Sequence, residues 1–185
     1  MIPTLDESLR LIELHRMPGH IFAHSIMVRR VALAIGSSLL ASNRDIDLRL
    51  VGSSALLHDI CKMECIGNGG DHALKGMELL CRYGYPRVGD VVGQHVRLRT
   101  LALDEAMVVN YADKRVMHTR VVSLDRRFVD LMARYGTDEG RRERILGHHR
   151  VCLQMEDMIV NACNADLEGL EGLNLIPVDQ TLDGG

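Results

Sequence analysis

The sequence contains no tryptophan and only two phenylalanines, so aliphatic side chains and methionine must build most of the core. Its five cysteines lack the paired C-x-x-C spacing of zinc ribbons and thioredoxin-like sites. An odd number of cysteines also argues against a disulfide framework, and we expect free thiols in a reducing cytoplasm. No apolar run is long enough to cross a membrane, and residues 1–7 do not have the pattern of a signal peptide.

Neither sign of charge is in large excess. The formal net charge is −3 with nine histidines counted as neutral, which gives no electrostatic footprint for nucleic acid. With 185 residues, 46% of them hydrophobic and 25% charged, the chain has the size and composition of one globular domain. Composition therefore gives no signal for a nucleic-acid or membrane partner, and it leaves a homodimer open.

Apolar residues recur at helical spacing and do not alternate, which predicts an all-α fold. A capping box, Thr4 with Glu7, opens a short helix that ends before Pro18. Further helices are predicted over 21–41, 48–58, 72–83, 86–95, 103–117, 121–135 and about 137–165. Residues 1–166 are expected to form the domain, and 167–185 a flexible acidic and glycine-rich tail.

One stretch, residues 54–62, places a histidine and an aspartate at the end of an apolar helix. His58 and Asp59 directly follow Ala55-Leu56-Leu57. An ionised carboxylate is expensive to bury alone, so a cation is expected beside Asp59. That cation is either a buried lysine or arginine, or a metal ion.

Other potential metal ligands are spread along the chain, in different predicted helices or at their ends. With His58 and Asp59 they form a set of six, namely His24, His58, Asp59, His72, His95 and Asp113. Helical bundles build metal centres from side chains that project inward from separate helices. A set of imidazoles and carboxylates without thiolate favours divalent ions, here Fe, Mn, Co, Ni, Zn or Mg, one or two in number. Six donors exceed the four ligands of a structural zinc site and leave room for catalysis.

The order and context of these residues resemble the HD superfamily of metal-dependent phosphohydrolases. The matching segments are His24-Ser25, Leu57-His58-Asp59-Ile60, Asp71-His72-Ala73, Gln94-His95 and Tyr111-Ala112-Asp113, and they span roughly residues 20–135. The segment 110–116 further resembles a small stand-alone bacterial branch of that superfamily. The resemblance implies a helical bundle with a metal centre between its helices.

The resemblance also implies roles for individual residues. His24, His58, Asp59 and Asp113 match the core metal ligands, and His72 and His95 match the additional pair of two-metal members, in which the carboxylate at the Asp59 position bridges both ions. A metal-activated hydroxide would then attack a phosphate ester or anhydride, with a nucleotide as the expected substrate. Asp59 and Lys62 are the expected catalytic residues. Lys62, Lys114 and Arg115 are the expected substrate-binding residues.

Other interpretations of these residues stay open at this point. Lys62 is equally well explained as a helix-end cation, and Arg115 as the partner of an acidic residue such as Asp104 or Glu105. The chain is alternatively a non-catalytic sensor or scaffold that binds nucleotide or metal, or a bundle whose buried His-Asp pairs are only structural. Val96-Arg97-Leu98 follows His95 where members that cut cyclic dinucleotides carry Gly-Tyr-Pro, so that activity is not expected.

Overall fold

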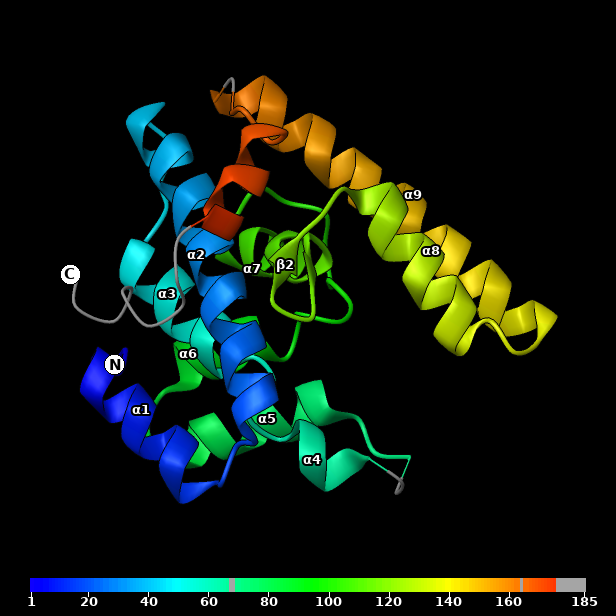
Figure 1. The fold of residues 1–185 in the computed structure, drawn as a ribbon. Coiled ribbons are helices and arrows are strands. Elements are labelled where there is room, and N and C mark those ends of the chain that lie inside the picture. Colours follow the sequence, from blue (N-terminus) through cyan, green and yellow to red (C-terminus); the bar gives the residue numbers. More distant parts are fainter. Residues whose placement is uncertain (67–68, 164, 176–185) are drawn as a thin grey trace.

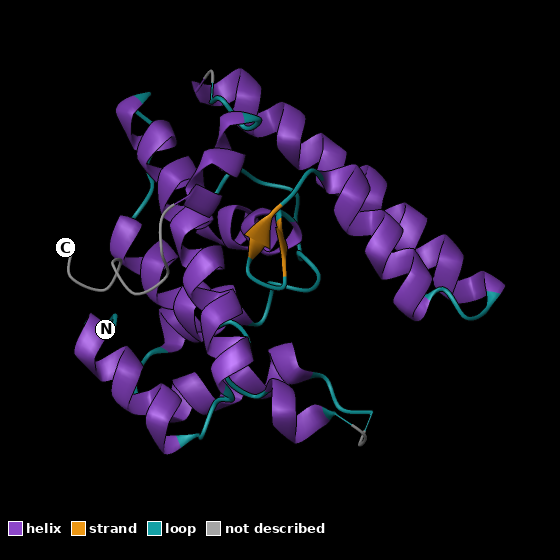
Figure 2. Cartoon of the chain, viewed as in Figure 1, coloured by secondary structure: helices purple, strands orange, loops and turns teal. Residues whose placement is uncertain are grey.

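The computed structural model describes residues 1–66, 69–163 and 165–175, and within them the fold is almost entirely helical (Figures 1 and 2). The elements in chain order are α1 (Leu5–Leu14), α2 (Gly19–Ala41), α3 (Leu48–Leu57), α4 (Lys62–Cys65), α5 (His72–Arg82), α6 (Pro86–Val92), α7 (Glu105–Lys114), β1 (Val116–Met117), β2 (Arg120–Val121), α8 (Leu124–Tyr135), α9 (Glu139–Cys163) and the 3-10 helix η1 (Gly169–Leu175). The all-α prediction is confirmed.

The predicted helix starts are found because local hydrogen bonding sets them. The Thr4 and Glu7 side chains form the complete capping box of α1. Asp47 accepts from two backbone N–H groups of α3, and Asp71 does the same for α5. Pro86 occupies the first turn of α6. These groups determine the residue at which each of these helices begins.

A two-stranded antiparallel hairpin replaces the end of one predicted helix. The sequence predicts helix over 103–117, but α7 ends at Lys114 and β1 pairs with β2 immediately afterwards. The turn between the strands holds His118 at a φ of 57°, a left-handed conformation that an α-helix does not contain. Figure 2 shows this small hairpin among the helices.

Helix α2 is the centre of the core (Figure 1). Apolar side chains on most of its circumference are buried, including Met27, Val28, Val31 and Ile35. A helix that is apolar on several sides must be surrounded by others, and α3, α7 and α9 pack against α2. His24 on α2 and Asp113 on α7, the first and last of the potential ligands in the chain, are therefore held by helices that pack against each other.

Helices α8 and α9 form an antiparallel hairpin that extends from the body of the molecule (Figure 1). The second half of α9 anchors it, because Cys152, Met155 and Ile159 are buried in the core. Helix α9 also packs along α8, and its first half leaves Leu146 exposed. The α8–α9 hairpin is therefore anchored in the core at one end and extends away from it at the other.

The expected tail is wrong for its first nine residues. Leu167 and Leu170 are buried, and the Asn174 side chain accepts a hydrogen bond from the Val121 N–H and donates one to the Val121 carbonyl. These contacts hold η1 against β2, so the folded part of the described chain continues to Leu175. Residues 176–185 lie outside the described residues. Within the described part, no helix combines the length and apolarity that a membrane span requires.

Candidate metal centre

The fold brings all six predicted ligands together. His24 lies on α2, His58 and Asp59 follow α3, His72 begins α5, His95 follows α6 and Asp113 lies on α7. They form two groups, and within each group the ligand atoms lie within 4.8 Å of one another. The first triad is His24, His58 and Asp113, and the second triad is Asp59, His72 and His95.

Three of the four imidazoles are oriented in the same way. The Nδ1 atoms of His24, His58 and His95 each lie 2.7–2.8 Å from a backbone carbonyl oxygen. Those carbonyls belong to His118, Ala55 and Val92. A carbonyl only accepts, so Nδ1 carries a proton and Nε2 is the ring nitrogen that faces the centre. Such an outer hydrogen bond is the usual support of a metal-bound histidine.

His58 provides the clearest sign that the site is built for a cation. Its ring is fully buried, and Nε2 has no hydrogen-bond partner among the described atoms. The nearest carboxylate oxygens are 3.4 Å away on Asp59 and 3.7 Å away on Asp113. A buried lone pair without a donor is unfavourable, whereas a divalent ion between the imidazole and these carboxylates would satisfy it. The residues present therefore fit a metal.

Asp59 faces both triads. Its Oδ2 atom lies 3.4 Å from His58 Nε2, on the side of the first triad. Its Oδ1 atom lies 3.3 Å from His72 Nε2 and 3.5 Å from His95 Nε2. One carboxylate thus has one oxygen toward each group, which is the arrangement that a bridging ligand requires.

Both carboxyl groups of the centre are held ionised. Burial raises the pKa of Asp59, but the charge interaction with His58 and the contacts with His72 and His95 outweigh it and leave that pKa well below its usual range. Burial likewise raises the pKa of Asp113, and Lys114 with His24 and His58 lowers it well below the usual range. Both groups are in the form that binds cations.

The two deepest histidines respond differently to the same surroundings. Burial lowers the pKa of His95 below its ordinary value, which keeps this imidazole neutral. Burial also lowers the pKa of His58, but the carboxylates of Asp59 and Asp113 outweigh burial and raise it. The negative charge that raises the pKa of His58 is the charge that a metal ion at this position would compensate.

Two lysines lie beside the carboxylates. Lys62 Nζ is 2.6 Å from Asp59 Oδ2, and Lys114 Nζ is 2.5 Å from Asp113 Oδ2. The Lys62 side chain keeps 40% of its surface exposed, and it reaches only one of the two Asp59 oxygens. The lysine explanation for the burial of Asp59 is thus incomplete, because the other oxygen faces imidazoles.

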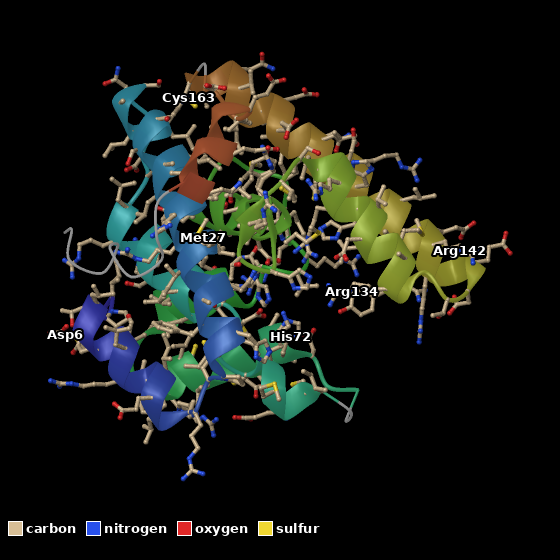
Figure 3. All side chains as sticks on the ribbon, in the orientation of Figure 1. Asp6, Met27, His72, Arg134, Arg142 and Cys163 are labelled. Atoms are coloured by element: carbon tan, nitrogen blue, oxygen red, sulfur yellow. The ribbon has the colours of Figure 1, made fainter. Side chains whose placement is uncertain are left out.

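The centre lies at the base of a cavity of about 620 Å³, a size typical of small-molecule sites. Both lysines and five of the six potential ligands line it, and His58 lies deeper. The opposite wall comes from α8 and α9. Figure 3 shows His72 and Arg134, one from each side, directed toward the space between the body and the hairpin.

Arg115 does not contribute to this cavity. Its guanidinium is buried and donates to the Val122 carbonyl at 2.7 Å, the Tyr111 hydroxyl at 2.7 Å and the Leu167 carbonyl at 2.8 Å. Glu156 lies 3.7 Å away. The predicted phosphate contact for Arg115 is therefore wrong, and the alternative of an acidic partner holds, with Glu156 in place of the acids considered.

Arg115→Ala is expected to destabilise the fold by about 3 kcal/mol or more, because it leaves buried acceptors unpaired. The free energy of unfolding is measured by urea denaturation monitored by circular dichroism, because the chain has no tryptophan whose fluorescence could report unfolding. Metal content should stay unchanged at low denaturant, and Arg126→Ala, an exposed change, serves as the control. A variant with wild-type stability and weaker phosphate binding would restore the predicted role of Arg115.

Several cavity residues are not part of the predicted site. His148 lines the cavity from α9, and His118, which is exposed, supplies the carbonyl that orients His24. Arg127 lines the cavity too. The sequence signal that could have identified Arg127 as a cavity residue is its spacing from Arg134, because residues seven positions apart lie on one face of a helix.

The fold and the centre define an all-α protein with a candidate site for divalent metal between its helices. A model of the HD domain matches residues 21–117, which are 97 of the 185 residues. The chain therefore belongs to the HD domain family. Comparison with curated proteins and with solved structures gave no significant match.

Proposed function

We propose that this protein hydrolyses a phosphate ester or anhydride, with a nucleotide as the substrate. The observation that carries the proposal is the pair of triads at the base of a cavity, with one oxygen of Asp59 directed toward each triad. Six donors around one open space are more than a structural ion needs. Family membership adds that HD domains bind divalent metals and are mostly metal-dependent phosphohydrolases.

In this proposal each triad holds one divalent ion, and Asp59 is a ligand to both. Bound ions would supply Lewis-acid activation of water and neutralise the charge of the phosphoryl oxygens. The chain's own contribution is orientation. The backbone carbonyls that hold Nδ1 of His24, His58 and His95 fix the ring planes, and the surrounding core prevents the ligands from moving apart.

Lys62 and Lys114 are the proposed phosphate contacts. Both amines lie at the edge of the centre, next to a carboxylate oxygen that a metal would also bind. When the carboxylates are used as ligands, the ammonium groups become available to phosphate oxygens or to the leaving oxygen. Lys62 is better placed for this because its side chain is partly exposed, whereas Lys114 is buried.

The test combines elemental analysis with an activity screen. We expect the purified protein to contain two divalent ions per chain and to hydrolyse at least one compound among nucleotides, dinucleoside polyphosphates, cyclic nucleotides and simple phosphate esters. Removal of metal by a chelator should abolish turnover, and addition of Mn²⁺ or Fe²⁺ should restore it. Protein without metal would overturn the proposal. Metal-loaded protein that hydrolyses none of these compounds would support the non-catalytic sensor instead.

The compartment and assembly belong to the same proposal. The free thiols of the described cysteines suit the reducing cytoplasm in which a nucleotide substrate would be met. A homodimer is the expected assembly. Gel filtration with light scattering measures it directly.

A further inference from the structure

One wall of the cavity comes from outside the region that matches the HD domain. The HD match ends at residue 117, whereas α8 and α9 begin at Leu124 and Glu139. From α8 the cavity is lined by Arg127, Leu131 and Arg134, at positions i, i+4 and i+7. From α9 it is lined by Arg141, Arg144 and His148, at positions i, i+3 and i+7. Each spacing is one face of a helix, so the hairpin directs one face of each helix at the metal centre.

Four of these residues are arginines, and we call Arg127, Arg134, Arg141 and Arg144 the arginine row. The cavity lining contains six lysines and arginines against two carboxylates. The two lysines are already paired with those carboxylates, so the excess of positive charge comes from the arginine row. This excess is found in a chain whose formal net charge is −3. The charge is therefore concentrated at the cavity and does not reflect the composition of the whole chain.

The arginine row is not neutralised by its own surroundings. Asp130 is shared by two of its members, Arg127 at 3.0 Å and Arg134 at 3.1 Å. Asp138 pairs with Arg141 at 3.2 Å. Among the described residues, no carboxylate lies within ion-pair distance of Arg144. Four guanidinium groups thus share two carboxylates, and a net positive wall remains opposite the metal centre.

We infer that the arginine row binds a second phosphate group of the substrate, so that compounds with linked phosphates are preferred over monoesters. This inference depends on the proposed function of the same site. A monoester would place its single phosphate at the metal centre and leave the arginine row unused. A phosphate chain would extend from the centre to the hairpin, where guanidinium groups bind phosphate oxygens in pairs.

The chemistry of the wall favours a small phosphate-chain compound over a nucleic-acid strand. Strand-binding grooves combine cations with aromatic platforms for successive bases. The chain has no tryptophan, and the cavity lining has only two aromatic residues besides histidine, Phe128 and Tyr135. Phe128 is buried and stacks with His149, with 4.5 Å between the ring centroids. It is thus not available to a base.

The test is the double variant Arg134→Ala/Arg144→Ala, in which both changed side chains are well exposed and the fold is expected to persist. Its matched control is Arg126→Ala/Arg150→Ala, which removes two exposed arginines from the same helices outside the cavity. Loss of about tenfold in kcat/KM for each phosphate-binding arginine is typical of a charge-assisted contact, so about 100-fold is expected for a nucleoside triphosphate. With p-nitrophenyl phosphate the change should stay below about twofold, because one phosphate does not reach the wall.

A binding arm separates this inference from the proposed function. Equilibrium dialysis of inorganic tripolyphosphate, at saturating Mn²⁺, should show the same selective loss in the double variant even if the protein hydrolyses nothing. The variant Arg134→Lys/Arg144→Lys should fall between wild type and the alanine variant, since it keeps charge and loses paired donors. Equal effects on triphosphate and monoester, or equal effects of the double variant and its control, would overturn the inference. Competition by a short oligonucleotide but not by tripolyphosphate would also overturn it.

Discussion

Asp59→Ala is expected to remove metal from both triads and to reduce turnover by more than about 100-fold, because this residue alone has an oxygen toward each group. Losing this carboxylate also leaves His72 and His95 without the anion of their triad, which lowers the cost of placing a cation there. The metal-to-protein ratio, measured by elemental analysis, should fall well below one. The isosteric change Asp59→Asn should behave similarly, since it removes the charge and keeps the volume.

The matched control is Asp157→Ala, which removes an exposed carboxylate from α9. Its metal content and turnover should equal those of the wild type. Far-ultraviolet circular dichroism must show the same helix content in all three variants, so that loss of metal is not loss of fold. An Asp59→Ala protein that retains both ions and full activity would exclude the bridging role.

His95→Ala is expected to lower the metal content from two ions per chain to one. The second triad loses a neutral imidazole, while the first triad, which contains His24 and His58, keeps all its donors. Turnover should fall by at least about 10- to 100-fold if both ions act on the phosphate. The change is confined to one triad because the Nε2 atom of His95 faces Asp59 and His72.

The control for this prediction is His15→Ala, whose imidazole contacts Tyr83 and does not line the cavity. Because His95 is buried, its truncation also leaves a void and frees the Val92 carbonyl. His95→Gln fills more of that volume and separates loss of a ligand from loss of packing. An unchanged metal ratio in both His95 variants would mean that the protein binds one ion.

Much of the fold followed from local patterns. The capping groups Thr4, Asp47 and Asp71 were readable because N-cap hydrogen bonds involve residues two or three positions apart. The hairpin of β1 and β2 was not predicted, since four residues give too short a pattern and its turn depends on His118 in a left-handed conformation. The packing of residues 167–175 was missed because the partners of Leu167 and Asn174, which are Arg115 and Val121, are remote in sequence.

The set of six potential ligands was predicted as a set, from residue type, order and resemblance. Arg115 shows the limit of that reasoning. It stands next to Lys114 and two residues after Asp113, yet its side chain points to Tyr111 and Leu167, away from the cavity. Neighbours in sequence on a helix are directed about 100° apart, so adjacency says little about which of two cations reaches a site.

The sequence by itself determined the helical class and the capped helix starts, because both depend on residue type and short-range spacing. It offered the six candidate donors through residue type, order and resemblance. The tertiary structure decided how those donors divide into two triads around Asp59, and that α8 and α9 bring arginines to the same cavity. These features arise from the crossing of helices far apart in the chain. Their geometry is set by packing around α2, which no local pattern records.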